Sequence, residues 1–212
     1  MPITDIHFML QGNRIPVDHA YHLYSALSET LPWIHRNNVG IQTVSGILEG
    51  ERSLMLTEKS RLIIRVNSED IVHILPLAGK TLSLHGNKVT IGIPSPKMLI
   101  PTANLYSRIV IIKGFMNPDD FLKAAGRHLQ EININAIPSL VEQQHIAETN
   151  EGKPTGTKSP YLRRTINIKG KKIVGFALRV NNLTAEESIT LQEKGLGGRR
   201  KLGCGIFIPD RR

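Results

Sequence analysis

The chain has 212 residues, of which 40% are hydrophobic and 5% aromatic, and it contains a single cysteine, Cys204. This length suffices for one large hydrophobic core or for two cores of about 100 residues each. One cysteine excludes a disulfide framework and a thiolate-rich metal centre, and no apolar run approaches the roughly 20 residues of a membrane span. Because no signal-peptide pattern follows Met1, we expect a cytoplasmic protein.

The net charge of +9 is distributed unevenly. Residues 1–150 contain 13 Lys and Arg against 13 Asp and Glu, whereas residues 151–212 contain 14 against 5. A basic segment attached to a neutral body indicates a polyanionic partner, most often nucleic acid. The alternative is a solvated basic face that only aids solubility.

The first half of the chain predicts the order βαββαβ with one additional strand. Residues 4–11 alternate as a strand, residues 14–17 read as a turn, and residues 18–31 form a helix that Asp18 caps. The elements that follow are strands over 40–48 and 61–67, a short helix over 68–75, and strands over 80–85 and 88–94. A two-residue turn at Gly86-Asn87 is expected between the last two strands.

The second half predicts the same order after a proline-rich linker that begins at Pro94. The expected elements are a strand over 105–113, a helix that begins at Asn117-Pro118, an ambiguous strand near 139–146, a basic hairpin of 164–168 and 173–180, a helix from the capping box Thr184–Glu187 to Lys194, and a strand over 204–209. Two such units predict an α+β fold of two tandem ferredoxin-like (βαββαβ, RNA-recognition-like) domains, over residues 1–95 and 104–212.

A glycine-rich loop precedes the last predicted strand and reads G-L-G-G-R-R-K-L-G-C-G. Its glycines are Gly195, Gly197, Gly198, Gly203 and Gly205, and its cations are Arg199, Arg200 and Lys201. Glycine permits positive φ and close approach, so successive amides can point at one anion while the cations hold phosphates. The loop is therefore predicted to bind an RNA backbone. The alternatives are a turn that only closes the last strand, or a dinucleotide-binding loop, which the order helix-loop-strand disfavours.

The placement of this loop between the last helix and last strand of a double ferredoxin-like chain resembles the G-h-G-x5-G-h-G motif of the RAMP superfamily of CRISPR-associated proteins, in which h is apolar. Over nearly the whole chain the sequence is similar to the endoribonucleases that cut CRISPR repeat transcripts into guide RNAs. The resemblance also includes Pro32-Trp33-Ile34-His35 after the first helix and the basic hairpin Arg163–Lys172.

This resemblance implies cleavage without metal or cofactor. The ribose 2′-OH beside the scissile phosphate attacks it and leaves a 2′,3′-cyclic phosphate and a 5′-OH. The implied partners are CRISPR repeat RNA, as precursor and as mature guide RNA, and other subunits of a CRISPR effector complex. In agreement, the sequence contains no metal-ligand spacing such as H-E-x-x-H.

The resemblance places the catalytic histidine just after the first helix, where His35 lies. Histidine suits proton transfer because its ordinary pKa lies near the working pH, and a position after Pro32 is expected to be exposed. The alternative is a surface histidine that interacts with a helix C-terminus. Because no lysine follows His35 closely, Arg36 or a cation of the glycine loop is expected to stabilise the phosphorane.

Two further histidines, His19 and His22, are rivals because they are three residues apart on one helix face. Tyr21 or Tyr24 could hydrogen-bond a phosphate or position a ribose hydroxyl there, although helical tyrosines also pack at core edges. The predicted catalytic residues are His35, Tyr21, His22 and Arg36.

A second basic group lies on the predicted hairpin and its approach. Its members are Lys158, Arg163, Arg164, Lys169, Lys171 and Lys172. Such a hairpin is predicted to recognise the shape and phosphates of an RNA stem, because the A-form major groove is too narrow for side chains to read. The alternative is an ordinary solvated strand face. The low aromatic content argues against a base-stacking platform.

Two functions stay open at this point. One is an endoribonuclease that processes CRISPR transcripts and keeps its product bound, and the other is a non-catalytic RNA-binding subunit of an effector complex. A cyclic phosphodiesterase or RNA-ligase-like enzyme is discounted because it would need two H-x-[ST] motifs. None of the eight histidines is followed at two positions by Ser or Thr.

Overall fold

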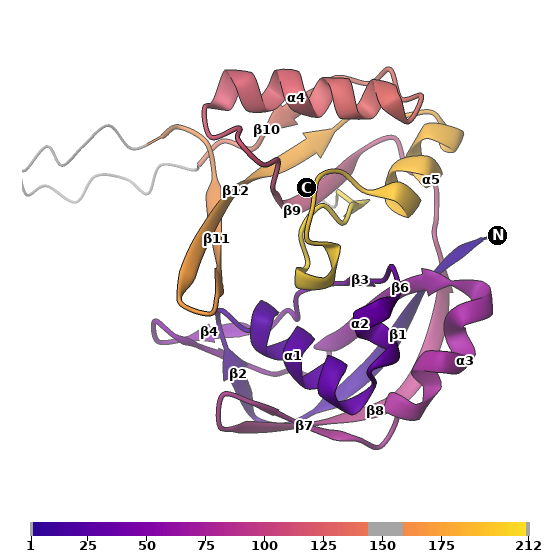
Figure 1. Cartoon of the computed structure of the whole chain (residues 1–212), viewed down its shortest axis with the longest axis vertical. Coiled ribbons are helices and arrows are strands. Elements are labelled where there is room, and N and C mark those ends of the chain that lie inside the picture. The colour runs from indigo at the N-terminus through magenta and orange to yellow at the C-terminus, as the bar shows by residue number, and fades with distance from the viewer. Residues whose placement is uncertain (1, 144–158, 211–212) are drawn as a thin grey trace, which may run out of the picture. The chain divides into compact units, whose positions relative to one another are not determined.

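The computed structural model describes residues 2–143 and 159–210, which fold into two compact units (Figure 1). Unit 1 contains Met1–Ile100, Ile166–Ile173 and Arg199–Ile206, and unit 2 contains Pro101–Thr165, Val174–Gly198 and Phe207–Arg212. The tip of the basic hairpin and the cationic part of the glycine loop thus belong to unit 1. The domains 1–95 and 104–212 stay a prediction, and these units show that chain order alone does not decide which residues pack together.

Unit 1 is built on an antiparallel sheet with the strand order β3-β6-β1-β8-β7. Its strands are β1 (Ile3–Gln11), β3 (Gly40–Ile41), β6 (Arg61–Asn67), β7 (Thr81–Leu84) and β8 (Asn87–Met98). The central pair, β1 and β6, has the register Ile6↔Ile64 and Phe8↔Leu62. The first and third strands of the βαββαβ unit therefore lie at the centre of the sheet, and β7 is the additional strand at its edge.

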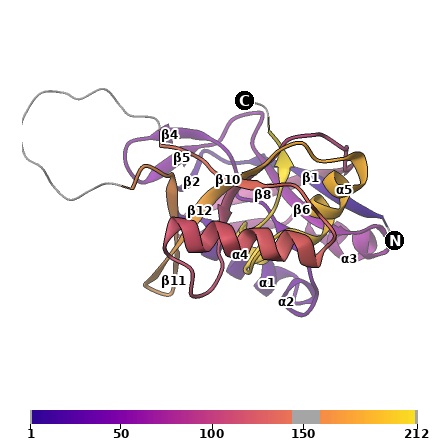
Figure 2. The same ribbon diagram turned by 90° about the horizontal axis from the view of Figure 1, so that it is seen from above.

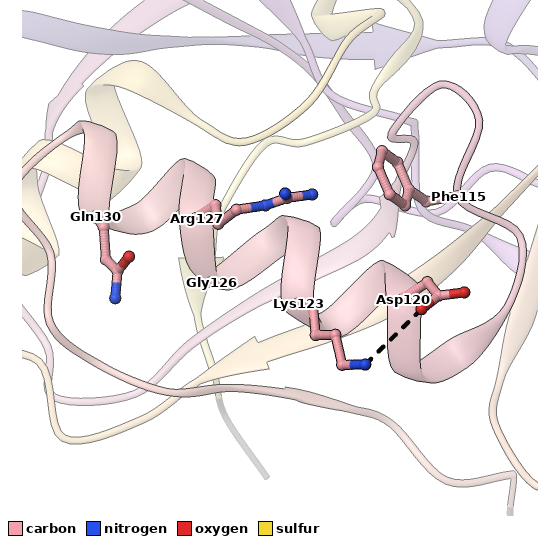
Figure 3. Close-up of a pocket in the computed structure, with 6 residues that line it drawn as sticks. All are labelled: Phe115, Asp120, Lys123, Gly126, Arg127 and Gln130. Atoms are coloured by element: carbon pink, nitrogen blue, oxygen red, sulfur yellow. Dashed lines mark ion pairs between the residues drawn. The ribbon is translucent and has the colours of Figure 1, made fainter.

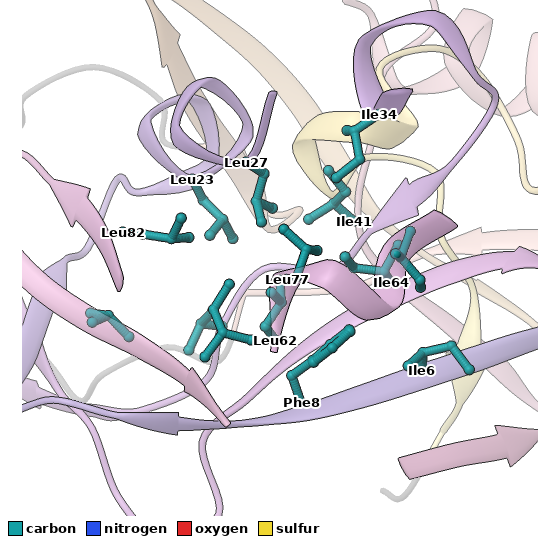
Figure 4. Packing of buried hydrophobic residues seen from close by; sticks show 14 of the residues in the cluster. Ile6, Phe8, Leu23, Leu27, Ile34, Ile41, Leu62, Ile64, Leu77 and Leu82 are labelled. Carbon is teal, nitrogen blue, oxygen red and sulfur yellow. The ribbon is translucent and has the colours of Figure 1, made fainter. Parts of the chain in front are cut away.

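The helices of unit 1 pack their apolar residues on this sheet. They are α1 (Ala20–Thr30), α2 (Trp33–Arg36), α3 (Ile71–Ile74) and the 3₁₀ turns Ser68–Asp70, Leu75–Leu77 and Arg200–Leu202, the last labelled η3. Leu23 and Leu27 of α1 lie in one buried cluster with Leu62 of the sheet (Figure 4). Burial of apolar surface at about 25 cal/mol per Å² is the main force that holds α1 in place.

The start of α1 differs from the prediction. Asp18 does not cap the helix, whose N-cap is His19 with no side-chain cap bond. The buried His19 instead uses both ring nitrogens, because Nδ1 donates to the Pro16 carbonyl at 2.9 Å and Nε2 accepts from the Val44 amide at 2.9 Å. The carboxylate of Asp18 accepts a hydrogen bond from the Asn167 amide at 3.3 Å. His19 is thus a neutral structural histidine and not a catalytic one.

Three further predictions for unit 1 are wrong in detail. Residues 40–48 are not one strand, because β3 joins the main sheet whereas β4 (Ile47–Glu49) belongs to a separate sheet with the order β2-β5-β4. Its other strands are β2 (Arg14–Pro16), where a turn was expected, and β5 (Ser53–Met55). The β7–β8 turn is at His85-Gly86, since Leu84 pairs with Asn87 and both turn residues have positive φ.

Unit 2 has the strand order β10-β12-β9-β13, with β11 paired to β12. Strands β10, β11 and β12 are labelled in both views (Figures 1 and 2). Its elements are β9 (Leu105–Val110), α4 (Pro118–Glu131), β10 (Pro138–Leu140), β11 (Arg163–Ile168), β12 (Lys171–Val180), α5 (Ala185–Lys194) and β13 (Ile208–Pro209). The predicted last strand is shorter than expected, because residues 204–207 are buried without strand pairing. The fold is the predicted pair of ferredoxin-like units.

Both long helices of unit 2 begin as predicted. Asn117 caps α4 by accepting from the amides of Asp119 and Asp120. Thr184 and Glu187 form a reciprocal capping box on α5. The Thr184 and Asn135 amides lower the pKa of the Glu187 carboxyl by hydrogen-bonding its charged form. No helix in the described part of the chain is both long and apolar enough to cross a bilayer.

A buried ion pair joins the two central strands of unit 1. Arg65 and Asp5 are direct partners in the β1–β6 register, and the contacts are bidentate, with Nε to Oδ1 at 2.7 Å and NH2 to Oδ2 at 2.8 Å. Gln42 adds a hydrogen bond to the same carboxylate at 3.2 Å. The side chain of Arg65 is only 1% exposed, so its charge depends on Asp5.

We expect Asp5→Ala to lower the free energy of unfolding by about 3–5 kcal/mol, because it leaves a buried guanidinium without its counter-ion. Urea unfolding followed by circular dichroism measures this loss. The double variant Asp5→Ala with Arg65→Met is expected to lose less, since it removes the uncompensated charge. A loss below about 1 kcal/mol for the single variant would show that water or another group neutralises Arg65.

Candidate active site

The first predicted catalytic residue, His35, is exposed on α2 and is hydrogen-bonded to a tyrosine of α1. The Tyr24 hydroxyl lies 2.7 Å from Nδ1 of His35. Local packing fixes α2, which carries His35, because Ile34 is fully buried and Trp33 stacks on His73 with ring centroids 5.0 Å apart. A bond at Nδ1 orients the imidazole and leaves Nε2 as the nitrogen that can exchange a proton with a substrate.

A lysine from the glycine loop reaches the same place. Nζ of Lys201, in η3, donates to the backbone carbonyl of His35 at 2.7 Å. Burial lowers the pKa of this ammonium below its ordinary value. The structure thus brings together His35, Tyr24 and Lys201, although Tyr24 and Lys201 are 177 residues apart in the sequence. Arg36, which was also predicted to be catalytic, is exposed on α2 next to His35.

The backbone of the glycine loop differs from the expected anion-binding arrangement. The Gly198 amide donates to the Ile111 carbonyl, the Leu202 and Cys204 amides to Arg199, and the Gly203 amide to Arg200. These four amides are used inside the protein and do not converge on an anion. Arg199 has a left-handed backbone conformation, with φ 68°, which is uncommon for a residue other than glycine.

Close packing explains two of the loop glycines. A Cβ on Gly203, which has φ 78°, would lie 2.8 Å from the Thr43 methyl group in unit 1. A Cβ on Gly197, at φ 75°, would overlap the Ile111 carbonyl oxygen in unit 2. Gly198 has open space around it, whereas Gly195 and Gly205 are buried at positive φ. The glycines therefore let η3 lie close to β3 and α1, where Lys201 meets His35.

The three loop cations have different surroundings. Arg199 is exposed, whereas Arg200 is partly buried near the Asp5–Arg65 pair. Burial and the charge of Arg65 lower the pKa of Arg200 to about 10, and Asp5 opposes this shift. Arg200 keeps its charge at neutral pH and adds positive potential beneath the loop.

The cations of the basic hairpin divide between the two units. Arg163 belongs to unit 2, where its guanidinium lies 5.1 Å from the Phe176 ring centroid and donates to the Met116 carbonyl. Arg164 is half-buried in the same unit. The remaining lysines, Lys169, Lys171 and Lys172, are exposed at the hairpin tip in unit 1. Lys158 lies outside the described residues.

The other two predicted catalytic residues, Tyr21 and His22, line a separate pocket of unit 1. We call it the α1 pocket, and it has a volume of about 880 Å³. Its lining includes Tyr21, His22, Arg52, His85, Lys169 and Lys172. The rings of His22 and His85 are 5.0 Å apart between centroids. The structure therefore separates the four predicted catalytic residues into His35 and Arg36 on α2, and Tyr21 and His22 at this pocket.

Sequence reasoning did not select Tyr24, His85 or Arg52. Tyr24 was named only as an alternative to Tyr21, since both lie on one helix and no local signal separates them. His85 is in a hairpin turn, and its approach to His22 comes from the packing of α1 against β7. No sequence spacing reports such a contact.

A second pocket, of about 560 Å³, lies on α4 in unit 2 (Figure 3). Its charged side chains already interact within the protein. Lys123 pairs with Asp120 at 4.0 Å, and the Arg127 guanidinium lies 5.8 Å from the Phe115 ring centroid. These exposed contacts contribute little to stability. Among the described residues, no three His, Cys, Asp or Glu side chains are grouped as metal ligands.

Two solved structures share this fold at low sequence identity. One, described as CRISPR associated protein Cas6, has a TM-score of 0.70 at 11% identity and covers 99% of this chain and 100% of that chain. Another, described as an RAMP protein binding different RNA substrates, has a TM-score of 0.61 at 12% identity and covers 98% of each chain.

Sequence comparison identifies the family. A protein of Myxococcus xanthus (strain DK1622) named CRISPR-associated endonuclease Cas6 is 35% identical over 210 residues, which are 99% of this chain and 82% of that protein. The sequence model of the family described as Cas6 Crispr matches residues 4–212. The resemblance inferred from the glycine loop is thereby confirmed, and the chain belongs to the Cas6 family of CRISPR-associated endonucleases.

Proposed function

We propose that this protein is a metal-independent endoribonuclease that cleaves CRISPR repeat RNA, with His35 as the catalytic histidine. The observation that carries this proposal is the arrangement of Tyr24 and Lys201 around His35. The Tyr24 hydroxyl lies 2.7 Å from Nδ1 of His35, and Nζ of Lys201 lies 2.7 Å from its backbone carbonyl oxygen. The endonuclease name of the 35% identical relative supports the nuclease assignment. The RNA-binding description of the RAMP structure supports RNA as the substrate.

In the proposed reaction, Nε2 of His35 takes the proton from the ribose 2′-OH as its oxygen attacks the adjacent phosphorus. The bond from phosphorus to the 5′ oxygen breaks, which leaves a 2′,3′-cyclic phosphate and, after protonation, a 5′-OH. Tyr24 holds the imidazole in the orientation that presents Nε2. The ammonium of Lys201 stabilises the negative charge of the phosphorane, the role that the sequence left to Arg36 or a loop cation.

The nucleotides that flank the cleavage position are proposed to contact exposed cations of unit 1. Arg199 of the glycine loop and Lys169, Lys171 and Lys172 of the hairpin tip supply this charge. Because these contacts do not involve the broken bond, they persist after cleavage. The product guide RNA is therefore proposed to stay bound, where other subunits of an effector complex can meet it.

We expect His35→Ala to lower the single-turnover cleavage rate about 10²- to 10⁴-fold, the usual contribution of a general acid or base. The assay uses labelled repeat RNA in EDTA, and His128→Ala on α4 is the control. If wild-type protein binds the RNA but does not cut it, the protein is a non-catalytic RNA-binding subunit. Equal cleavage rates for wild type and His35→Ala would show that His35 is not the catalytic histidine.

Lys201→Ala is expected to slow cleavage more than Arg36→Ala, because only Lys201 is held against His35. The cleavage rate should also fall as the pH rises through the lowered pKa of Lys201, since deprotonation removes the cation. Lys201→Arg should shift this alkaline limb to higher pH. A pH–rate profile of the three variants checks both expectations, and an unchanged alkaline limb in Lys201→Arg would contradict them.

The triple variant Lys169→Ala, Lys171→Ala and Lys172→Ala should bind repeat RNA more weakly and with a flatter salt dependence. Each lost contact to a single-stranded phosphate lowers the slope of log K against log salt by about 0.7. Fluorescence anisotropy at several salt concentrations measures the slope, and Arg127→Ala on α4 serves as the control. The same slope in wild type and triple variant would mean that the hairpin tip does not touch RNA.

A further inference from the structure

We infer that the α1 pocket binds one unpaired nucleotide of the substrate RNA, as an anchoring site separate from His35. This inference rests on the proposed function, because it assigns the pocket to the same RNA. The volume of about 880 Å³ is within the roughly 300–1,000 Å³ range of small-molecule sites and leaves room for a single nucleotide. Its walls combine ring faces and cations, the two kinds of group that hold a base and its phosphate.

The ring faces come from α1 and the β7–β8 turn. His22 and His85 have ring centroids 5.0 Å apart and planes inclined by 42°, and Tyr21 meets His22 edge-on at 6.1 Å. Tyr21 and His22 are half-buried, which limits their motion, whereas His85 is exposed at the tip of its turn. A planar base can stack on such rings without the extended aromatic platform that the composition excludes.

The charge of the pocket favours an anion. Its lining carries four cations, Arg14, Arg52, Lys169 and Lys172, against two carboxylates, Asp18 and Glu51. Arg14 is partly balanced by Glu49 at 3.8 Å, and Asp18 is engaged by the Asn167 amide. Arg52 and the lysines at the hairpin tip, Lys169 and Lys172, therefore remain as the groups best placed to contact a phosphate beside the stacked base.

The geometry of the histidine pair favours binding over a second catalytic centre. Phosphoryl displacement places the attacking and leaving oxygens in line on opposite sides of phosphorus. Two imidazoles that pack against each other cannot lie on those opposite sides. His35, by contrast, is oriented by Tyr24 and has a cation beside it.

The test uses a CRISPR repeat RNA with 2′-deoxyribose at the cleaved position and 4-thiouridine at its unpaired positions. Ultraviolet cross-linking and mass spectrometry are expected to recover RNA on peptides that contain Tyr21, His22 or His85. In anisotropy titrations His85→Asn should raise the Kd about tenfold, in line with the loss of one base stack. Asn tolerates the positive φ of this position, so the turn is preserved. Lys88→Ala, an exposed lysine of β8 outside the pocket lining, is the matched control.

The outcomes separate the inference from the proposed function. Cross-links elsewhere in the chain, or a Kd of His85→Asn equal to that of the control, would overturn the anchoring site. A His85→Asn protein whose saturating cleavage rate collapses while its Kd is unchanged would overturn it too, by making the pair a second proton-transfer site. If wild-type protein does not cut all-ribose RNA, the proposed cleavage fails, yet the cross-links and Kd values still decide whether the pocket binds RNA.

Discussion

The buried pair of Asp5 and Arg65 constrains the part of unit 1 on which the site depends. These residues are direct partners across β1 and β6, so a slip of either strand by one residue would turn its charged side chain to the other face of the sheet and break the pair. The pair also influences the glycine loop, since the charge of Arg65 lowers the pKa of Arg200 and the charge of Asp5 raises it. The loop residue that follows, Lys201, is the one that reaches His35. Strand register and the position of the proposed catalytic cation are therefore linked.

Helix α1 contributes to two different chemical environments of this Cas6-family protein. Leu23 and Leu27 hold it on the sheet, which leaves other positions for function. Tyr24 meets His35 on α2, whereas Tyr21 and His22 line the pocket with His85. An exposed and oriented imidazole suits proton transfer, and a pair of packed imidazoles suits stacking. The buried His19 uses both of its nitrogens in the core, so the histidines of unit 1 lie in three different environments.

Local rules predicted some elements well and failed at others for identifiable reasons. The helices that begin at Asn117 and Thr184 follow from caps within four residues, so they were confirmed. Residues 40–48 have the composition of one strand, but their partners belong to two sheets, and no local pattern specifies a distant partner. The turn at His85-Gly86 was misplaced by one residue because Gly86 and Asn87 both tolerate positive φ and therefore also fit a two-residue turn. The observed turn places His85 at the pocket.

The amino-acid sequence by itself determined the fold class and the family motif, because these depend on periodicity, capping and a contiguous glycine pattern. His35 was selected through the family resemblance and stays a prediction. It also located the excess charge in the last 62 residues. Only the tertiary structure decided where those cations lie: Lys201 contacts His35, Arg200 is partly buried near the Asp5–Arg65 pair, and Lys169 and Lys172 line the α1 pocket. The physical reason is that hydrogen bonds and desolvation act between atoms within a few ångströms, and chain folding, not sequence distance, decides which atoms those are.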